Sequence, residues 1–312
     1  MALQVQPIAF KPMRLNGLSA RLLASHYENN YGGAVRRLNA IKGDLARLQM
    51  AGAAGFVLNG LKREELIATN SMLLHELYFD GLGGSGGSPE GALAEAIGRD
   101  FGSVERWRAE FTAMGRALGG GSGWVILTRS PRDGGLSNVW AADHTHAMAG
   151  GTPILALDMY EHAYHLDFGA NPAAYVEAFM NNLHWPRIAA RFAGEQAAPR
   201  ANLIDTLAAK QRLDAEPDLV VIDARLPNDA ATVPVRLSGA RRAPPDQVDA
   251  IAASLPPGSK ALVYCAWGFE IGGDCAARLR ERGIDAVAVE GGLGAWRADG
   301  LLTEPLTEGE HA

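Results

Sequence analysis

The chain of 312 residues contains only two cysteines, Cys265 and Cys275, both in its last fifth. Disulfide bonds therefore cannot stabilise the chain before Cys265, and a reducing compartment such as the cytoplasm is expected. No uncharged apolar run reaches the roughly 18 residues that cross a bilayer, so no contact with a membrane is predicted. The N-terminal segment lacks a basic region before an apolar stretch, so no secretory signal is predicted either.

Long clusters of lysine and arginine are also absent, and the formal net charge is -6. Nucleic acid is therefore not expected as a partner, because its recognition depends on concentrated positive charge. Hydrophobic residues make up 47% and charged residues 21%, a composition typical of soluble globular proteins. A chain of this length predicts two or more domains.

Helical spacing dominates residues 1–87, where apolar side chains recur every three or four positions between Val35 and Leu48. This spacing predicts an α-helical hairpin that ends in the glycine-rich residues 81–87. Ser88 and Pro89 then resemble a helix start, with Pro89 at the first helical position. Helices near 93–97 and 104–118, followed by two short strands around the turn at 131–135, predict an α+β subdomain over residues 88–194.

Small and polar residues at 195–200 predict a linker, and residues 201–305 then form a separate pattern. Strands are expected at 219–222, 261–264 and 286–289. Helices are expected at 273–282 and 294–298. Strands that alternate with helices predict an α/β domain with a parallel sheet.

Four potential metal ligands stand out in the first 194 residues: His26, His75, Asp158 and His162. The i and i+4 spacing of Asp158 and His162 puts both on one helical face, or at a strand end and the following turn. Antiparallel pairing of the hairpin helices would bring His26 and His75 to one level. Three imidazoles and one carboxylate suit iron, manganese or zinc better than calcium or magnesium.

Residues 1–194 resemble the iron/manganese superoxide dismutase family. The resemblance rests on LN at 38–39, GSGW at 121–124, DMYEHAY at 158–164 and NNLHW at 181–185, beside the segments that carry His26 and His75. It implies that the four ligands hold one iron or manganese ion per chain, with a solvent molecule in the fifth position. The implied reaction converts two superoxide ions and two protons into oxygen and hydrogen peroxide.

The resemblance also implies residues around the metal. A glutamine or histidine usually faces the bound solvent, and here Ser71 and His144 compete for that role, with His146 as a further alternative. We favour His144 as a catalytic residue. Trp124 and Tyr160 are expected beside the ligands, where hydrogen bonds set the potential of the metal.

A homodimer is implied as well. Glu161 corresponds to the glutamate that bridges to the partner's last histidine ligand, so each metal site depends on the dimer. Asn30 and His165 both fall on the family's second contact across the dimer.

Several family residues are replaced around the cavity. Ala34 stands at the position of the gateway tyrosine, Asn171 at that of an arginine that attracts the anionic substrate, and Ile126 at that of an aromatic residue. Superoxide dismutation is the leading function. The alternative is a metal-binding dimeric platform with little dismutase activity, which tethers a sulfurtransferase or binding module.

Cys265 ends an apolar strand and is followed by the loop residues Ala266, Trp267, Gly268, Phe269 and Glu270. Residues 200–305 resemble the rhodanese domain in VIDAR at 221–225, SGA at 238–240, the cysteine loop, and EGGLGAW at 290–296. The resemblance implies that Cys265 is a nucleophile that carries sulfur as a persulfide. An unreactive cysteine in a binding domain is the alternative.

The cysteine loop departs from the patterns of active enzymes. Ile271 replaces the arginine that a phosphatase loop requires, which disfavours a phosphatase. Glu270 replaces the usual rhodanese arginine. We expect its charge to offset the lowering of the thiol pKa by the helix N-terminus, so that sulfur transfer is weak. Cys275 is interpreted as core packing.

Overall fold

The computed structural model describes residues 2–195 and 202–306, so most of the expected linker lies outside the described residues. The chain forms two compact units, Ala9–Ala197 and Ala198–Ala312, and residues Met1–Ile8 belong to the second unit. The sequence interpretation places these N-terminal residues with the helical hairpin instead. Among the described residues, no helix is long and apolar enough to cross a membrane.

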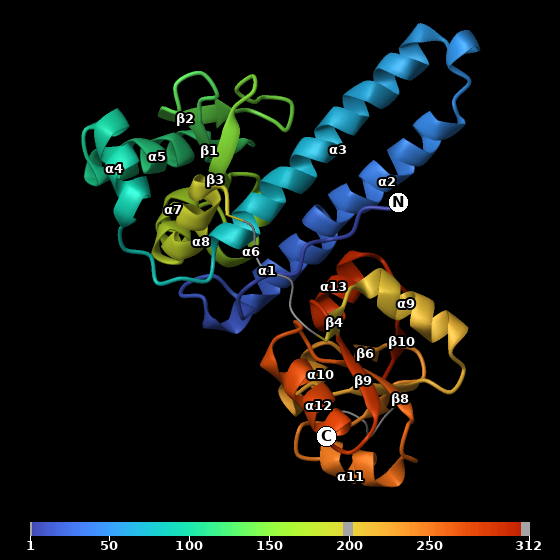
Figure 1. Ribbon diagram of the computed structural model, residues 1–312. Helices are drawn as coiled ribbons and strands as arrows, with labels where there is room; N and C mark the ends of the chain where they lie inside the picture. Colours follow the sequence, from blue (N-terminus) through green and yellow to red (C-terminus); the bar gives the residue numbers. More distant parts are fainter. Residues whose placement is uncertain (1, 196–201, 307–312) are drawn as a thin grey trace. The chain divides into compact units, whose positions relative to one another are not determined.

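The first unit begins with helices that carry two of the four candidate ligands (Figure 1). After a 3-10 turn at Pro12–Arg14, α1 spans Ala20–Ser25, a π-helical turn spans His26–Tyr31, and α2 spans Gly32–Arg47. A second 3-10 turn at Met50–Gly52 leads into α3, Gly55–Gly81. Helices α2 and α3 pack against each other as the long hairpin in Figure 1.

The next helices are α4, Gly91–Phe101, and α5, Val104–Leu118. The expectation that Pro89 opens α4 is wrong. Glu90 is the extended N-cap residue, and the backbone of Gly91 has a φ of +60°, so a regular helix cannot include Pro89. Helix α5 starts as its sequence suggests, because the Ser103 side chain accepts a hydrogen bond from the backbone N–H of Arg106.

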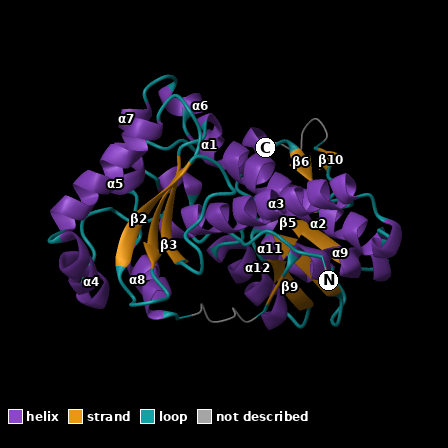
Figure 2. Cartoon of the chain, turned by 90° about the horizontal axis from the view of Figure 1, so that it is seen from above, coloured by secondary structure: helices purple, strands orange, loops and turns teal. Residues whose placement is uncertain are grey.

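A three-stranded antiparallel sheet with the order β2-β1-β3 follows (Figure 2). Its strands are β1, Trp124–Arg129, β2, Leu136–Ala141, and β3, Thr152–Asp158. The sequence interpretation allowed Asp158 to lie at a strand end but gave no bounds for β3, although its run of apolar residues is a strand signal. Trp124 pairs with Asp158 across β1 and β3, which brings GSGW and DMYEHAY together.

The unit ends with a 3-10 turn at Glu161–Ala163 and the helices α6, His165–Phe168, α7, Pro172–Asn181, and α8, Trp185–Ala193. Asp158 is thus the last residue of β3 and His162 lies in the turn that follows. The strand-end alternative for this pair is confirmed, and the helical-face alternative is wrong.

The second unit contains a five-stranded parallel sheet with the order β4-β9-β8-β5-β7. These strands are β4, Leu203–Ile204; β5, Val220–Asp223; β7, Arg241–Arg242; β8, Lys260–Tyr264; and β9, Asp285–Val289. A short antiparallel pair joins β6, Val235–Arg236, to β10, Glu304–Pro305. The parallel sheet agrees with the α/β prediction.

Helices cover both faces of this sheet. They are α9, Thr206–Ala215; α10, Pro227–Thr232; α11, Val248–Ser254; α12, Glu270–Glu281; and α13, Gly292–Ala298. Ile222 and Val263 pack on one face with Leu279 of α12, whereas Val221 and Leu262 pack on the other. Successive side chains of β5 and β8 therefore face opposite sides of the sheet, as in any β-strand.

Helix α12 begins three residues earlier than the sequence predicts. Glu270 is therefore the first residue of α12 and not a loop residue, and Arg282 is the C-cap. An acidic residue in the first turn of a helix is favoured by the helix dipole, which explains the early start.

Candidate functional site

The four predicted metal ligands lie together in the first unit. His26 comes from the π-helical turn, His75 from α3, Asp158 from the end of β3 and His162 from the following turn. One ligand atom from each residue lies within 4.8 Å of the others. The first three side chains are fully or almost fully buried, and His162 is partly exposed. The cluster is closed except beside His162.

Three imidazole nitrogens point at a single oxygen of Asp158. The Nε2 atoms of His26 and His162 each lie 3.1 Å from Asp158 Oδ2, and Nε2 of His75 lies 3.4 Å from the same atom. Such convergence of imidazole nitrogens on one carboxylate is the arrangement that holds a cation.

The tautomer of His75 also supports a cation site at this cluster. Its Nδ1 donates a hydrogen bond to the backbone oxygen of Ser71 at 2.6 Å, and burial lowers the pKa of His75 to about 3. The neutral ring therefore carries its proton on Nδ1, and the lone pair of Nε2 faces the Asp158 oxygen. Nε2 has no hydrogen-bond partner among the described residues. Two electron-rich atoms in this position fit a positive ion between them.

Asp158 is held in the charged form. Burial alone would raise its pKa, but the charges and hydrogen bonds of His162 and His26 outweigh burial and hold the pKa below its ordinary value. The backbone N–H of Tyr160 donates to Asp158 Oδ1 at 2.9 Å, which leaves Oδ2 for the histidines. The Tyr175 hydroxyl donates to the Asp158 backbone oxygen at 2.8 Å and fixes the strand end.

His144 lies beside the cluster, and the Tyr160 ring lies between the rings of His144 and His162. Its ring stacks on Tyr160 at 4.9 Å between centroids, and Tyr160 stacks on His162 at 5.4 Å. His144 Nδ1 accepts a hydrogen bond from Trp124 Nε1 at 3.0 Å, and burial lowers the pKa of His144. The neutral ring therefore carries its proton on Nε2, which makes His144 a donor beside the ligands.

Ser71 and His146, the alternatives to His144 for the residue that faces the bound solvent, have other partners. Ser71 serves His75 through its backbone oxygen, and its hydroxyl lies 3.4 Å from the same Nδ1 atom. His146 is exposed, and its Nδ1 lies 3.2 Å from Asp143 Oδ1. The backbone oxygen of His144, in contrast, accepts a hydrogen bond from Asn70 of α3 at 2.6 Å, which fixes its loop near the second ligand.

The remaining predicted residues lie around this core. Glu161 and His165 are exposed, and Asn30 is partly exposed in the π-helical turn. Asn171 caps α7, where its side chain accepts a hydrogen bond from the N–H of Ala174. Ala34 is buried within α2. Sequence reasoning missed Tyr31, which is buried and stacks on the His75 ring; its spacing from His26 gave no direct signal.

Cys265 occupies a second chemically distinctive position, directly after β8. Its Sγ accepts a hydrogen bond from the N–H of Gly268 at 3.2 Å, and its side chain is 4% exposed. Burial raises the pKa of this thiol, and backbone N–H groups of the loop and of Gly272 partly oppose the increase. Burial therefore has a larger effect than sequence reasoning allowed. Cys275 lies in the hydrophobic core, as predicted.

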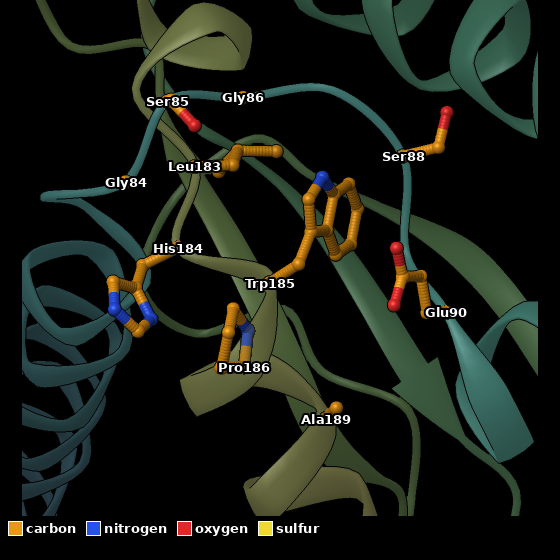
Figure 3. Close-up of a pocket in the computed structure, with 10 residues that line it drawn as sticks. All are labelled: Gly84, Ser85, Gly86, Ser88, Glu90, Leu183, His184, Trp185, Pro186 and Ala189. Atoms are coloured by element: carbon orange, nitrogen blue, oxygen red, sulfur yellow. The ribbon is translucent and has the colours of Figure 1, made fainter.

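A cavity of about 520 Å³ lies elsewhere in the first unit (Figure 3). The Trp185 indole forms part of its wall, and Ser88 and Glu90 lie along the segment that precedes α4. None of the four candidate ligands lines this cavity. It is therefore separate from the histidine cluster.

The fold and the four converging side chains of the first unit define a protein with a mononuclear centre of three histidines and one aspartate. The profile described as "Iron/manganese superoxide dismutases, C-terminal domain" matches residues 89–191. The chain is 69% identical over 193 residues to a protein named superoxide dismutase [Fe] from Cupriavidus metallidurans, covering 62% of this chain and 98% of that protein. The chain belongs to the iron/manganese superoxide dismutase family.

Other relatives carry either metal in their names. Superoxide dismutase [Mn] 2 of Haloferax volcanii is 36% identical over 200 residues, covering 63% of this chain and 98% of that protein. Superoxide dismutase [Fe] of Aquifex aeolicus is 33% identical over 189 residues, covering 58% and 87%. The Cupriavidus protein is about as long as the first unit alone, so its length leaves no room for a counterpart of the second unit.

Proposed function

We propose that this chain is a superoxide dismutase in which His26, His75, Asp158 and His162 hold one iron or manganese ion. The observation that carries the proposal is the convergence of three Nε2 atoms on one Asp158 oxygen. The relatives' names support the choice of metals, because they include both iron and manganese enzymes. A donor set of three nitrogens and one oxygen suits both.

A bound iron or manganese ion would supply the electron transfer, because both metals are stable in the +3 and +2 states. The protein must then deliver protons to the reduced product. His144 is the group we assign to this task, because its Nε2 proton is fixed by the Trp124 hydrogen bond to Nδ1. Tyr160 holds the His144 ring parallel to itself at an interplanar angle of 13°.

The altered cavity predicts slower turnover than is usual for the family. Ala34 offers no phenol for proton transfer, and Asn171 is committed to capping α7. Of the two nearby arginines, Arg37 pairs with Glu64, and Arg36 donates to the Glu28 backbone oxygen. The platform with little dismutase activity therefore stays as the second candidate function.

Metal analysis together with a dismutase assay tests these alternatives. We expect about one iron or manganese ion per chain, and we expect its loss in His75→Ala. A His75→Ala protein that keeps its full redox metal content would contradict the ligand assignment. A native protein that binds metal but has no dismutase activity would favour the platform. A rate near the diffusional ceiling of roughly 10⁸ to 10⁹ M⁻¹s⁻¹ would contradict the argument for slow turnover.

We also propose a homodimer in which Glu161 reaches the partner's metal site. Its position between the ligands Asp158 and His162, and its exposure in the single chain, support this role. His165 and Leu166 are exposed next to it. Sedimentation of the native protein and of Glu161→Gln tests the proposal, and a native monomer would contradict it. The cytoplasmic location stays a prediction from the two unpaired cysteines.

For the second unit we propose a rhodanese-like sulfur carrier. The Cys265 thiolate would attack the outer sulfur of a sulfane donor such as thiosulfate, form a persulfide, and release sulfite; an acceptor thiolate would then remove the outer sulfur. The parallel sheet and the N–H groups around Cys265 support the proposal. Mass spectrometry after thiosulfate treatment should detect one added sulfur, and Cys265→Ser should prevent it.

Glu270 provides a sharper test of this proposal. Its place in the first turn of α12, close in sequence to Cys265, predicts that its charge opposes an anionic donor. Glu270→Arg should therefore raise thiosulfate-dependent transfer. If Cys265 carries a persulfide and Glu270→Arg brings no gain, the charge at this position does not limit the unit.

A further inference from the structure

One partly buried hydrogen bond joins the two helical segments that carry the first two histidines. Tyr31 is the last residue of the π-helical turn that begins at His26, and its hydroxyl donates to Glu76 Oε1 at 2.9 Å. Glu76 directly follows His75 in α3. Tyr31 is 1% exposed. The bond therefore ties both ligand segments together beside the metal centre.

The Tyr31 ring also restrains the His75 ring directly. The two rings stack with centroids 6.2 Å apart and an angle of 25° between planes. Trp124 meets the same imidazole edge-on at 5.2 Å, and Ser71 holds its Nδ1. With Nδ1 bound and two rings in contact, His75 can direct Nε2 only toward Asp158. Of these contacts, Tyr31 alone also comes from the segment that carries His26.

We propose that Tyr31 is a positioning residue of the metal centre, which fixes the separation of His26 and His75 through its hydrogen bond to Glu76. This inference rests on the proposed metal site. A hydrogen bond from a hydroxyl to a carboxylate is stronger than one between neutral groups, and low solvent access strengthens it further. Tyr31 lies on the first-ligand segment three residues before Ala34, which stands where the family has a tyrosine.

Tyr31→Phe is the direct test, because it keeps the ring and removes only the hydroxyl. Manganese-loaded protein is mixed with excess EDTA, and the first-order rate of metal release is measured. Loss of a hydrogen bond to a charged group predicts release that is faster by roughly tenfold. Glu76→Ala removes the acceptor instead and should give a similar increase. Glu76→Gln keeps an acceptor oxygen but loses its charge, and should give a release rate between those of the native protein and Glu76→Ala.

A second measurement separates positioning from general stability. The electron paramagnetic resonance spectrum of bound Mn²⁺ reports the symmetry of its ligands, and Tyr31→Phe should change its line shape. Arg37→Gln is the matched control, because Arg37 of α2 pairs with Glu64 of α3 and joins the same hairpin at an exposed place. We expect native release and a native spectrum from this control.

The outcomes distinguish this inference from the metal assignment itself. If His75→Ala loses metal while Tyr31→Phe and Glu76→Ala keep the native release rate and spectrum, the positioning role is wrong and the metal site stands. If His75→Ala retains metal at the native rate, the proposed site fails. If Arg37→Gln accelerates release as much as Tyr31→Phe, the effect belongs to the hairpin as a whole, and the inference is overturned.

Discussion

Removal of one partner of the buried ion pair at the end of β5 should strongly destabilise the second unit. Arg225 Nε lies 2.9 Å from Asp223 Oδ1, and Arg225 Nη2 lies 2.5 Å from Asp223 Oδ2. The same guanidinium donates to the backbone oxygens of Val233 and Val235 at 2.7 and 2.8 Å. Both charged side chains are fully buried. Asp223→Ala would therefore leave a buried positive charge without its carboxylate.

Breaking a buried pair from one side costs about 3 to 5 kcal/mol, because the remaining charge cannot return to water. Arg242 adds to the expected loss of stability, because its Nη1 lies 3.7 Å from Asp223 Oδ1 and would also lose its counter-charge. The double variant Asp223→Ala with Arg225→Met should cost less than the sum of the single variants, because it removes both charges of the main pair.

Native-state hydrogen exchange, followed by mass spectrometry, measures this effect on peptides that contain β5 and β8. The control is Asp214→Ala, which removes the exposed pair of Lys210 and Asp214 on α9 and should leave protection unchanged. If Asp223→Ala lowered the opening free energy of β5 by less than about 1 kcal/mol, the buried-charge argument would be refuted.

Three further predictions concern the second unit. Gly268→Ala should abolish persulfide formation, because φ at Gly268 is +72° and an added Cβ would lie 2.2 Å from a backbone nitrogen. The control Gly273→Ala should leave persulfide formation intact, because nothing lies within 4 Å of a Cβ added there. Deletion of residues 2–7 should lower hydrogen-exchange protection of α13 and leave α3 unchanged. In the Cys275→Ser variant, Cys265 is the one remaining cysteine. The rate of its alkylation by iodoacetamide should still rise above pH 9, because burial raises the pKa of the Cys265 thiol. An alkylation rate that reaches its plateau below pH 8 would contradict this prediction.

The deletion prediction follows from contacts of the N-terminal segment. The backbone N–H of Val5 donates to Asp299 Oδ1 at 2.9 Å, and Gln4 donates to Asp205 and Thr206 at the start of α9. Val5 is 5% exposed, so its removal also uncovers apolar surface. Unchanged protection of α13 in the shortened chain would show that these contacts do not stabilise the unit.

Features that depend on the local order of residues could be predicted from the sequence. Parallel strands in the second unit appear as short apolar runs, and β5, β8 and β9 lie within one residue of the predicted positions. The histidine cluster was predictable for a related reason. Each ligand sits on or directly beside a regular element, so their spacing along the chain reports their place in the fold.

Other features depend on tertiary contacts that no spacing encodes. Residues 2–8 form a short irregular segment, and its hydrogen bonds and packing place it with the second unit. The pKa of Cys265 was misjudged for the same reason. The dipole and the Glu270 charge can be read from the sequence, but the burial that raises the thiol pKa comes from packing around the loop.

The altered cavity illustrates how position-by-position comparison can mislead. Ala34 indicates a missing aromatic ring on the first-ligand segment, yet Tyr31 supplies a ring that contacts His75 from three residues earlier. Asn171 indicates a missing positive charge, and its side chain has the separate role of starting α7. The first change is accompanied by an aromatic contact to a ligand, whereas Asn171 itself supplies no positive charge. Metal binding should therefore be retained more fully than attraction of an anionic substrate.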